Sequence, residues 1–331
     1  MVAAQKMRRP AVVALQTLVI AACYYGAGRL GLMRRLTVEG AVFTPIWPPT
    51  GVAVAALLII GLRAWPGIAI GALLVVLSLS SFSSLQPSAA GIVAGNTIAP
   101  VCAWLLLRAV HFRTDLSRFR DGLALVFLAA LGAMTISASV DVGLLVSTGK
   151  LALEDFWPVW LAWWVGDAMG VLIVTPVILM LYAVRPPISL ARWKEAAVIL
   201  VAAGVMVPVA TRSSISLLFL IYPLLIWAAL RFELPGSLVC ALFASVMATV
   251  AATEGAGPFH RLSHTEVMIK LQAFNGTMAL TALLLSAVIT EQRNTRRSVE
   301  LACQELVEVL EHLTAGNPTP RPPPKEGEGR G

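Results

Sequence analysis

Charged residues are scarce in this sequence. Only 13% of its 331 residues are Asp, Glu, Lys or Arg, and 58% are hydrophobic, whereas about a quarter of the residues of an ordinary soluble domain are charged. A chain this apolar cannot hide its hydrophobic side chains in one aqueous core, which excludes a soluble globular protein. The sequence predicts an all-α fold, a polytopic integral membrane bundle of about eight to ten transmembrane helices.

Cysteine is also rare, and neither CxxC nor any Cys/His ligand spacing occurs. The four cysteines are scattered singly, which indicates neither a disulfide framework nor a zinc site. His260 and His264 would suit a metal only in a helical loop, and we expect a solvated loop there. We predict no enzymatic activity, no cofactor and no metal. The net charge of +7 is expected mainly in cytoplasmic loops and indicates no nucleic-acid partner.

Ten apolar runs are long enough, or nearly long enough, to cross a bilayer. Those at 48–62, 64–80, 196–210 and 215–230 are short enough to be tilted or re-entrant. The first run follows a basic start and resembles a signal peptide, but we interpret it as a retained span because the rest of the chain is also apolar. The runs fall at about 11–31, 48–62, 64–80, 89–110, 122–147, 156–184, 196–210, 215–230, 236–253 and 267–289.

Lysine and arginine are distributed unevenly between the two sides of the predicted bundle. With the N-terminus inside, fifteen lie in inner segments, seven in outer segments and three in the tail, of 25 in all. The positive-inside rule then places both termini in the cytoplasm. Arg34 and Arg35 are exceptions, because they fall in the first outer loop.

The stretch WLAWWVGDAMGVLIVTP, residues 160–176, places Asp167 deep in a predicted span. A carboxylate at mid-membrane costs about 2.5–3.5 kcal/mol on insertion scales, and such residues are functional candidates by default. One interpretation is a carboxylate that fastens neighbouring helices through hydrogen bonds. The other is a ligand, ion or proton site that responds to a signal. The sequence leaves both interpretations open.

Aromatic and small residues accompany Asp167. Trp163 and Trp164 lie on its outer side, where they either pack between helices or form the wall of a ligand pocket. Gly166 and Gly170 have the small-xxx-small spacing that lets another helix approach closely. This face of the predicted helix is therefore expected to turn away from lipid.

These motifs together resemble the first family of bacterial membrane-associated sensor (MASE) domains. The resemblance covers roughly residues 11–293, and its most distinctive string is WWVGDAMG at 163–170, followed by Thr175-Pro176. The other strings are FTPIWPPTG at 43–51, GLRAWPG at 61–67, GNT at 95–97, WAALRF at 227–232, GAGPF at 255–259 and LQAF at 271–274. The resemblance implies a sensory domain of the bacterial inner membrane, which usually precedes a histidine kinase, or a GGDEF or EAL domain of cyclic di-GMP signalling.

The sequence departs from the family pattern in two places. After Arg297 only 34 residues remain, with no GGDEF sequence, kinase ATP site or Gly-rich phosphate loop. We therefore expect a sensor whose output is a separate histidine kinase or cyclic-di-GMP enzyme. Asp141 stands where the family more often has a small residue. The candidate ligand or sensing residues are Asp167, Trp163, Trp164, Trp47, Asn96 and Asp141, and the candidate helix-packing residues are Gly166, Gly170, Pro48, Pro49 and Gly51.

The chain is expected to have four parts. A cytoplasmic N-terminus (1–10) precedes the membrane domain (11–293), which is surrounded by lipid. A cytoplasmic helix (294–314) and a disordered tail (315–331) follow. The helix carries an a/d seam suited to a homodimer or a signalling contact, and its members are Val299, Cys303, Leu306, Leu310 and Leu313.

Two other functions fit the same sequence. The spans at 48–110 resemble those at 215–289 in order and orientation, and internal repeats of this kind occur in transporters. A small-molecule permease or channel is therefore the main alternative to a sensor. A truncated sensor remnant without an output is the other.

Overall fold

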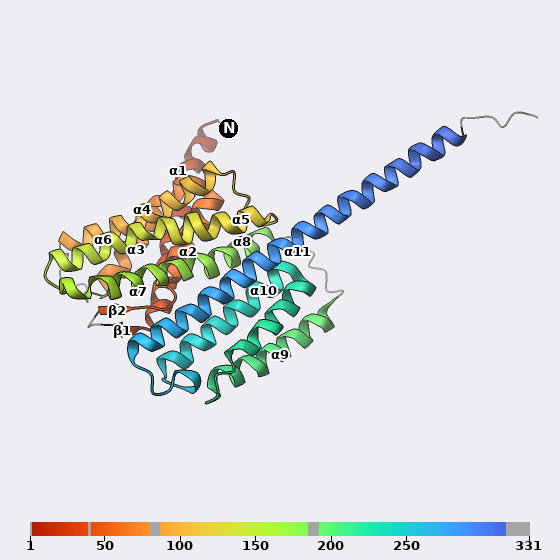
Figure 1. The fold of residues 1–331 in the computed structure, drawn as a ribbon. Helices are drawn as coiled ribbons and strands as arrows, with labels where there is room; N and C mark the ends of the chain where they lie inside the picture. Colours follow the sequence, from red (N-terminus) through yellow and green to blue (C-terminus); the bar gives the residue numbers. More distant parts are fainter. Residues whose placement is uncertain (1, 39–40, 80–86, 185–191, 316–331) are drawn as a thin grey trace, which may run out of the picture. The chain divides into compact units, whose positions relative to one another are not determined.

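Helices make up nearly all of the described chain (Figure 1). The computed structural model describes residues 2–38, 41–79, 87–184 and 192–315, in two compact units, Met1–Thr290 and Glu291–Gly331. The elements, where η marks short 3-10 or π segments, are α1 (Val2–Leu32), β1 (Leu36–Val38), β2 (Ala41–Phe43), α2 (Pro48–Ile60), η1 (Gly61–Ala64), α3 (Trp65–Leu79), α4 (Pro87–Ala109), α5 (Phe119–Ala124), η2 (Leu125–Ala133), α6 (Met134–Ser147), η3 (Leu153–Asp155), α7 (Phe156–Met169), η4 (Gly170–Val174), α8 (Thr175–Ala183), α9 (Trp193–Arg212), η5 (Leu218–Leu220), α10 (Ile221–Thr253), η6 (Gly257–Phe259) and α11 (His264–Ala315). The predicted all-α fold is confirmed.

Eight stretches of the described chain are long and apolar enough to cross a membrane, so the protein is a multi-pass membrane protein. Large apolar side chains cover the outside of the bundle where lipid would contact it. On α9, for example, Val201 and Val205 are 66% and 60% exposed, while Ala203 and Val207 on the opposite face are buried. Such a two-sided apolar helix is typical of a bundle whose solvent is lipid.

The stretch Pro48–Leu79 is a hairpin of two short helices. α2 ends at Gly61, whose φ of 78° terminates it. A Cβ atom on Gly28 of α1 would lie 2.6 Å from Val75 and 3.5 Å from Pro49, although a straight helix would separate those two residues by about 39 Å. The chain therefore turns back between α2 and α3.

α10 turns back in the same way, at Glu233. This residue has φ 53° and ψ −136°, a region of the backbone map that favours glycine. A Cβ atom on Gly236 would lie 2.6 Å from the carbonyl oxygen of Ala228, whereas a straight helix would place the two residues about 12 Å apart. With both hairpins resolved, each of the ten apolar runs of the sequence corresponds to a helical segment.

The two hairpins do not change which side of the membrane the rest of the chain occupies. A hairpin returns to its starting side whether it crosses the bilayer twice or is re-entrant, and α2 and α3 are only 13 and 15 residues long. The remaining crossings are even in number, so the start of α1 and Thr290 lie on the same side.

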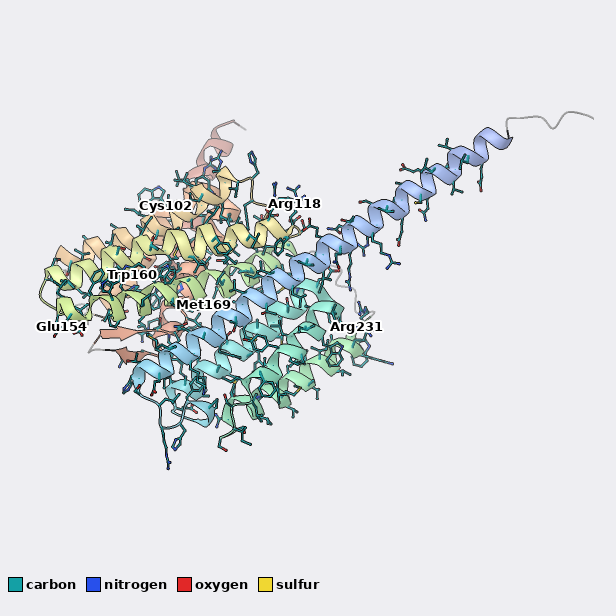
Figure 2. All side chains as sticks on the ribbon, in the orientation of Figure 1. Cys102, Arg118, Glu154, Trp160, Met169 and Arg231 are labelled. Carbon is teal, nitrogen blue, oxygen red and sulfur yellow. The ribbon has the colours of Figure 1, made fainter. Side chains whose placement is uncertain are left out.

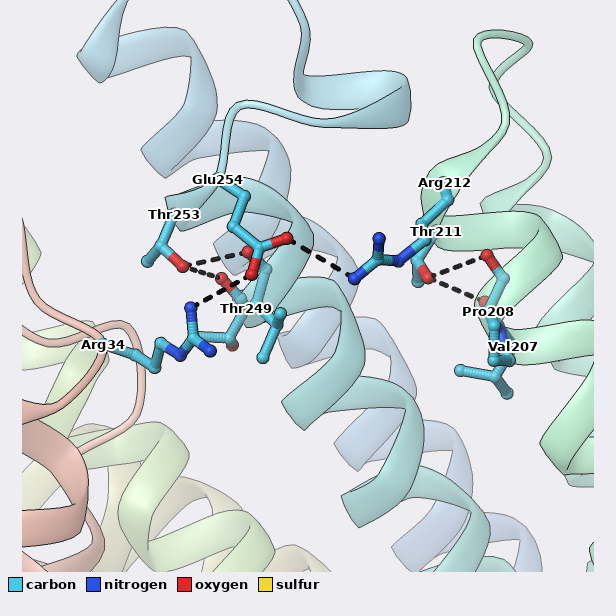
Figure 3. A network of polar contacts seen from close by, with 9 residues as sticks. Arg34, Val207, Pro208, Thr211, Arg212, Thr249, Thr253 and Glu254 are labelled. Carbon is cyan, nitrogen blue, oxygen red and sulfur yellow. Dashed lines mark hydrogen bonds and ion pairs between the residues drawn. The ribbon is translucent and has the colours of Figure 1, made fainter.

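Charged side chains meet where α1, α9 and α10 end (Figure 3). Glu254 pairs with Arg34 at 3.3 Å and with Arg212 at 3.5 Å. All three belong to segments that the sequence places on the outer side. Glu254 also offsets the charge of Arg34, which explains how one exception to the positive-inside rule is accommodated.

A second charged group joins two segments predicted on the inner side. Arg192 pairs with Glu195 at 2.6 Å, and Arg231, labelled in Figure 2, pairs with the same carboxylate at 3.5 Å. The Arg192 guanidinium also lies 5.1 Å from the centre of the Phe232 ring. Each charged group thus joins segments assigned to one side, in agreement with the alternation of the predicted spans.

A short antiparallel hairpin of β1 and β2 follows α1, with Leu36 opposite Phe43 and Val38 opposite Ala41. The sequence analysis did not predict it. Each strand has only three residues, too few for alternation of polar and apolar residues to distinguish a strand from a loop. The hairpin leads directly into the Trp47-Pro48-Pro49 segment at the start of α2.

The first unit contains two large apolar cores. One core joins α4, η2, α7 and η4, with Leu107, Leu125 and Leu172 fully or almost fully buried. The other joins α9, α10 and α11, which lie side by side in Figure 1, and includes Val207 and Leu271. The candidate site lies in the part of the unit formed by α1–α8.

Candidate functional site

Asp167 is 1% exposed, and both of its carboxylate oxygens accept hydrogen bonds. Thr50 Oγ1 of α2 donates to Oδ1 at 2.6 Å, and the Ser137 hydroxyl of α6 donates to Oδ2. Both hydroxyl groups can donate to an ionised carboxylate, the state in which both oxygens accept. A hydrogen bond to a charged group contributes about 1.5–3 kcal/mol, which offsets the expense of Asp167 at membrane depth. The two bonds tie α2, α6 and α7 together.

The two most distinctive sequence motifs pack directly against each other. The Trp47 backbone N–H donates to the Gly166 carbonyl at 2.9 Å. A Cβ atom on Gly166 would lie 2.6 Å from the Thr44 carbonyl oxygen, and one on Gly170 would collide with the Trp47 carbonyl. Glycine is therefore required on both sides of Asp167, because the chain entering α2 crosses α7 at backbone contact. Gly51 lies at the same crossing, against Gly170, whereas Pro48 and Pro49 at the start of α2 lie beside Gly31 and Gly28 of α1.

π segments adjoin the residues that hold the carboxylate. η4 begins three residues after Asp167, and η2 ends four residues before Ser137. π-helical turns are rare and occur frequently at functional sites. Two of the three helices that meet at Asp167, α6 and α7, therefore adjoin a turn wider than that of an α-helix.

A second buried carboxylate lies nearby. Asp141 is 0% exposed, and its Oδ2 accepts a hydrogen bond of 2.7 Å from Asn96 Nδ2. Its Oδ1 has no hydrogen-bond partner in the described part of the chain. Asp141 and Asp167 lie within electrostatic range of each other, and no described Lys, Arg or His forms an ion pair with either. The site therefore holds two buried acidic side chains.

A cavity of about 390 Å³ borders Asp167, within the size range of small-molecule sites. It is lined by Tyr24, Trp47, Asn96, Trp163 and Asp167. It is also lined by residues that lie near the ends of their helices or in the loop after α6, namely Leu32, Leu79, Ser88 and Lys150. The structure thus brings four of the six predicted sensing residues together around one cavity.

The other two predicted sensing residues do not line the cavity. Asp141 lies behind Asn96, to which it is bonded. Trp164 stacks on Trp160 with 5.6 Å between ring centres, and its indole N–H donates to the Leu131 carbonyl at 2.9 Å. Its position is that of a helix-packing residue.

Three residues at the site were missed by the sequence analysis. Thr50 and Ser137 hold Asp167, and Tyr24, which is 1% exposed, lines the cavity. Thr50 stands inside the Trp-Pro-Pro-Thr-Gly string and Ser137 lies four residues before Asp141. In the sequence, the signal for Thr50 and Ser137 was their proximity to another motif residue.

Metal ligands do not gather anywhere in the described chain. No described group of three or more His, Cys, Asp or Glu side chains could hold a metal ion. Both carboxylates at the site are accompanied by hydroxyl and amide groups instead. Apolar side chains form most of the cavity wall, and Asn96 and Asp167 are among its polar groups.

The candidate signalling seam lies in the second unit. Val299, Leu306 and Leu310 are each more than half exposed, and Cys303 is also exposed. The side chain of Leu313 lies outside the described residues. Other apolar residues of this segment are exposed as well, namely Leu301, Val307 and Val309, so the apolar surface is wider than the predicted seam.

Comparison of the sequence with models of known families identifies one family. A sequence model of the MASE1 family matches residues 16–293. No curated protein and no solved structure matches the chain. The chain belongs to the MASE1 family, whose members are membrane-associated sensor domains, sensory rather than catalytic. The resemblance found in the sequence is confirmed.

Proposed function

We propose that this MASE1 chain detects a small ligand in the cavity beside Asp167 and passes the signal through α11 to a cytoplasmic partner. The observation that carries the proposal is a fully buried carboxylate that borders a cavity of about 390 Å³. A carboxylate that only fastened helices would need its two hydroxyl donors but no adjoining cavity. An occupant would contact the same side chain that ties α2, α6 and α7 together.

α11 contacts both motifs that form the site. Gln272 Nε2 donates to the Pro45 carbonyl at 3.0 Å, two residues before Trp47. A Cβ atom on Gly276 would lie 3.8 Å from the Cε atom of Met169, which is labelled in Figure 2. Met169 is two residues after Asp167 in the sequence. A change in the crossing of α2 over α7 therefore reaches α11 through direct contacts.

The turn of α10 holds α11 near Thr290. Glu233 Oε2 accepts a hydrogen bond of 3.3 Å from Thr290 Oγ1. The Ser237 and Ser286 hydroxyls are 2.5 Å apart. These bonds position α11 at the boundary of the first unit, from which it continues as helix to Ala315.

The output is proposed to involve a second copy of the chain and a separate enzyme. The exposed residues at 299, 303, 306 and 310 have the spacing of a coiled-coil seam, and a second copy would bury it. The partner class is a histidine kinase or a cyclic-di-GMP enzyme of the bacterial inner membrane, with both termini of this chain in the cytoplasm.

Cysteine cross-linking of the native chain tests this proposal. Cys303 is exposed, so disulfide formation between two copies reports the seam, after Cys23 and Cys102 are changed to Ser. We expect Asp167→Asn to change the cross-linking rate about fivefold or more, a coupling typical of linked sites. Glu154→Gln, in an exposed outer segment, is the matched control and should leave the rate unchanged. An unchanged rate in folded Asp167→Asn protein would contradict the proposal.

Two further measurements separate the sensor from its alternatives. Substrate flux into proteoliposomes that Asp167→Asn abolishes would favour a permease and overturn the sensor. A kinase or cyclic-di-GMP enzyme that copurifies with the chain, and is lost when residues 298–313 are deleted, would support the sensor. Copurification that survives the deletion would contradict an output through α11.

A further inference from the structure

We propose that the cavity binds a small organic cation, an amine or a quaternary ammonium compound, with its charged group beside Asp167. This inference rests on the proposed function in one respect only, which is that the cavity is a ligand site. The hydrogen bonds of Asp167 and the aromatic walls of the cavity support this class of ligand.

Both oxygens of Asp167 accept hydrogen bonds from hydroxyl groups, the arrangement of an ionised carboxylate, and no described Lys, Arg or His forms an ion pair with it. A buried charge is normally paired with an opposite charge. Asp141 adds a second acidic group with an unbonded Oδ1. The group missing from this site is therefore a cation.

The walls of the cavity favour an organic cation over a metal ion. Tyr24, Trp47 and Trp163 line it, and the faces of Trp and Tyr rings attract ammonium groups, including quaternary ones. A volume of about 390 Å³ is far larger than a bare ion requires. A metal ion would also need more oxygen ligands than the described carboxylates supply.

Lys150 also lines the cavity but forms no ion pair with Asp167, whose two oxygens accept from Thr50 and Ser137. It lies in the loop before α7, and Asp167 is eleven residues into that helix.

Calorimetric titration of the chain in lipid nanodiscs tests the ligand class with three probes of one shape. Cyclohexylammonium, cyclohexanol and cyclohexanecarboxylate differ only in charge and polar group. We expect the ammonium to bind about tenfold or more tighter than the alcohol, because its bond to Asp167 is charge-assisted, and the carboxylate not to bind. Equal binding of ammonium and alcohol, or a preference for the carboxylate, would overturn the proposal.

Variants locate the binding and control for folding. Asp167→Asn should weaken cyclohexylammonium binding about tenfold or more, whereas Glu154→Gln, outside the cavity lining, should not. Should Asp167→Asn fail to fold, Trp163→Leu serves instead, since it leaves the carboxylate bonds in place and removes one aromatic wall. Unchanged affinity in folded Asp167→Asn or, failing that, in Trp163→Leu would refute the assignment. Displacement of cyclohexylammonium by an equal concentration of sodium chloride would also refute the assignment, because the site would then bind a simple inorganic ion as well as an organic cation.

The outcome for the ligand class can be separated from the outcome for the sensor. Cation binding without any change in Cys303 cross-linking would support this inference and contradict the proposed function. A neutral or anionic compound that changes cross-linking in an Asp167-independent way would support a sensor and contradict this inference.

Discussion

The α1–α8 region and the α9–α11 region of the first unit are both apolar bundles, but they bury different polar groups. All three buried carboxylates of the described chain, Asp121, Asp141 and Asp167, lie in α1–α8. In α9–α11 the buried polar residues are neutral, namely Thr211, Ser237, Ser245, Thr249, Asn275 and Ser286. A carboxylate at membrane depth is expensive, and the confinement of the buried carboxylates to the region with the cavity supports the proposed ligand site there.

The α9–α11 region is built for close packing instead. The second limb of α10 buries small residues at Cys240, Ala241, Ala244 and Ala248, a pattern that lets helices approach closely within a membrane. Two of its contacts with the site, at Gln272 and Gly276, are on α11. Under the proposed function, the α1–α8 region binds the ligand and the α9–α11 region transmits the signal.

The largest predicted effect breaks the crossing of the two motifs. In Gly170→Ala the new methyl group would collide with the Trp47 backbone carbonyl, which cannot move away easily. We expect the free energy of unfolding to fall by about 3 kcal/mol or more, at the upper end of overpacking effects. Gly204→Ala in α9 is the control, since nothing lies within 4 Å of a Cβ atom added at Gly204. Its free energy of unfolding should rise by about 0.5–1 kcal/mol. Chemical denaturation in detergent micelles measures both, and similar losses in the two variants would contradict the assigned crossing.

A hydroxyl deletion in each region sharpens the comparison. Thr50→Val removes a donor to Asp167 and should destabilise the chain by about 1–3 kcal/mol, because a charged acceptor is left unpaired. Thr249 Oγ1 has no described partner, so Thr249→Val should be neutral or slightly stabilising. Thr50→Ser should restore most of the loss. Equal effects of the two valine variants would show that the Thr50 bond contributes nothing.

The turn of α10 tests whether backbone strain is stored in the transmission region. Glu233→Gly relieves a positive φ that costs about 1–3 kcal/mol in a non-glycine residue, but loses the bond to Thr290. Glu233→Ala also loses the hydrogen bond to Thr290, but its positive φ remains strained. The glycine variant should therefore be more stable than the alanine variant by about 1 kcal/mol in the same denaturation assay. The opposite order would mean that the turn is unstrained.

The smallest effect is expected at the outer ion pairs. Glu254→Gln removes both pairs with Arg34 and Arg212, whose side chains are 46% and 58% exposed. Exposed pairs contribute about 0–1 kcal/mol and are weakened by salt. The difference between variant and parent should shrink as sodium chloride is raised during thermal unfolding. A large effect that persists at high salt would indicate a structural role for this cluster.

Much of the fold could be predicted from the sequence, because a bilayer demands long apolar runs and leaves little choice of structure. The hairpin at 61–67 has a glycine and a proline where the chain turns. The turn at Glu233 was less visible: Pro235 and Gly236 marked a returning span, but a positive φ at glutamate contradicts residue preference. The β1–β2 hairpin was missed because three-residue strands have no readable period.

The candidate site was only half visible in the sequence. Asp167 stands out as a charge in an apolar run, and its flanking glycines as a packing motif. Thr50 and Ser137 do not stand out, because a hydroxyl in an apolar helix most often bonds to its own helix backbone. Tyr24 resembles an ordinary interfacial aromatic residue. Partners from distant segments cannot be identified until the helices are placed against one another.

The most direct measurement of the central claim follows Cys303 cross-linking while cyclohexylammonium is titrated into the chain in nanodiscs. The account predicts a saturable change of about fivefold or more in the parent chain and in Glu154→Gln, and none in folded Asp167→Asn. A cross-linking rate that is unaffected by bound cyclohexylammonium, or that changes equally in Asp167→Asn, would contradict it.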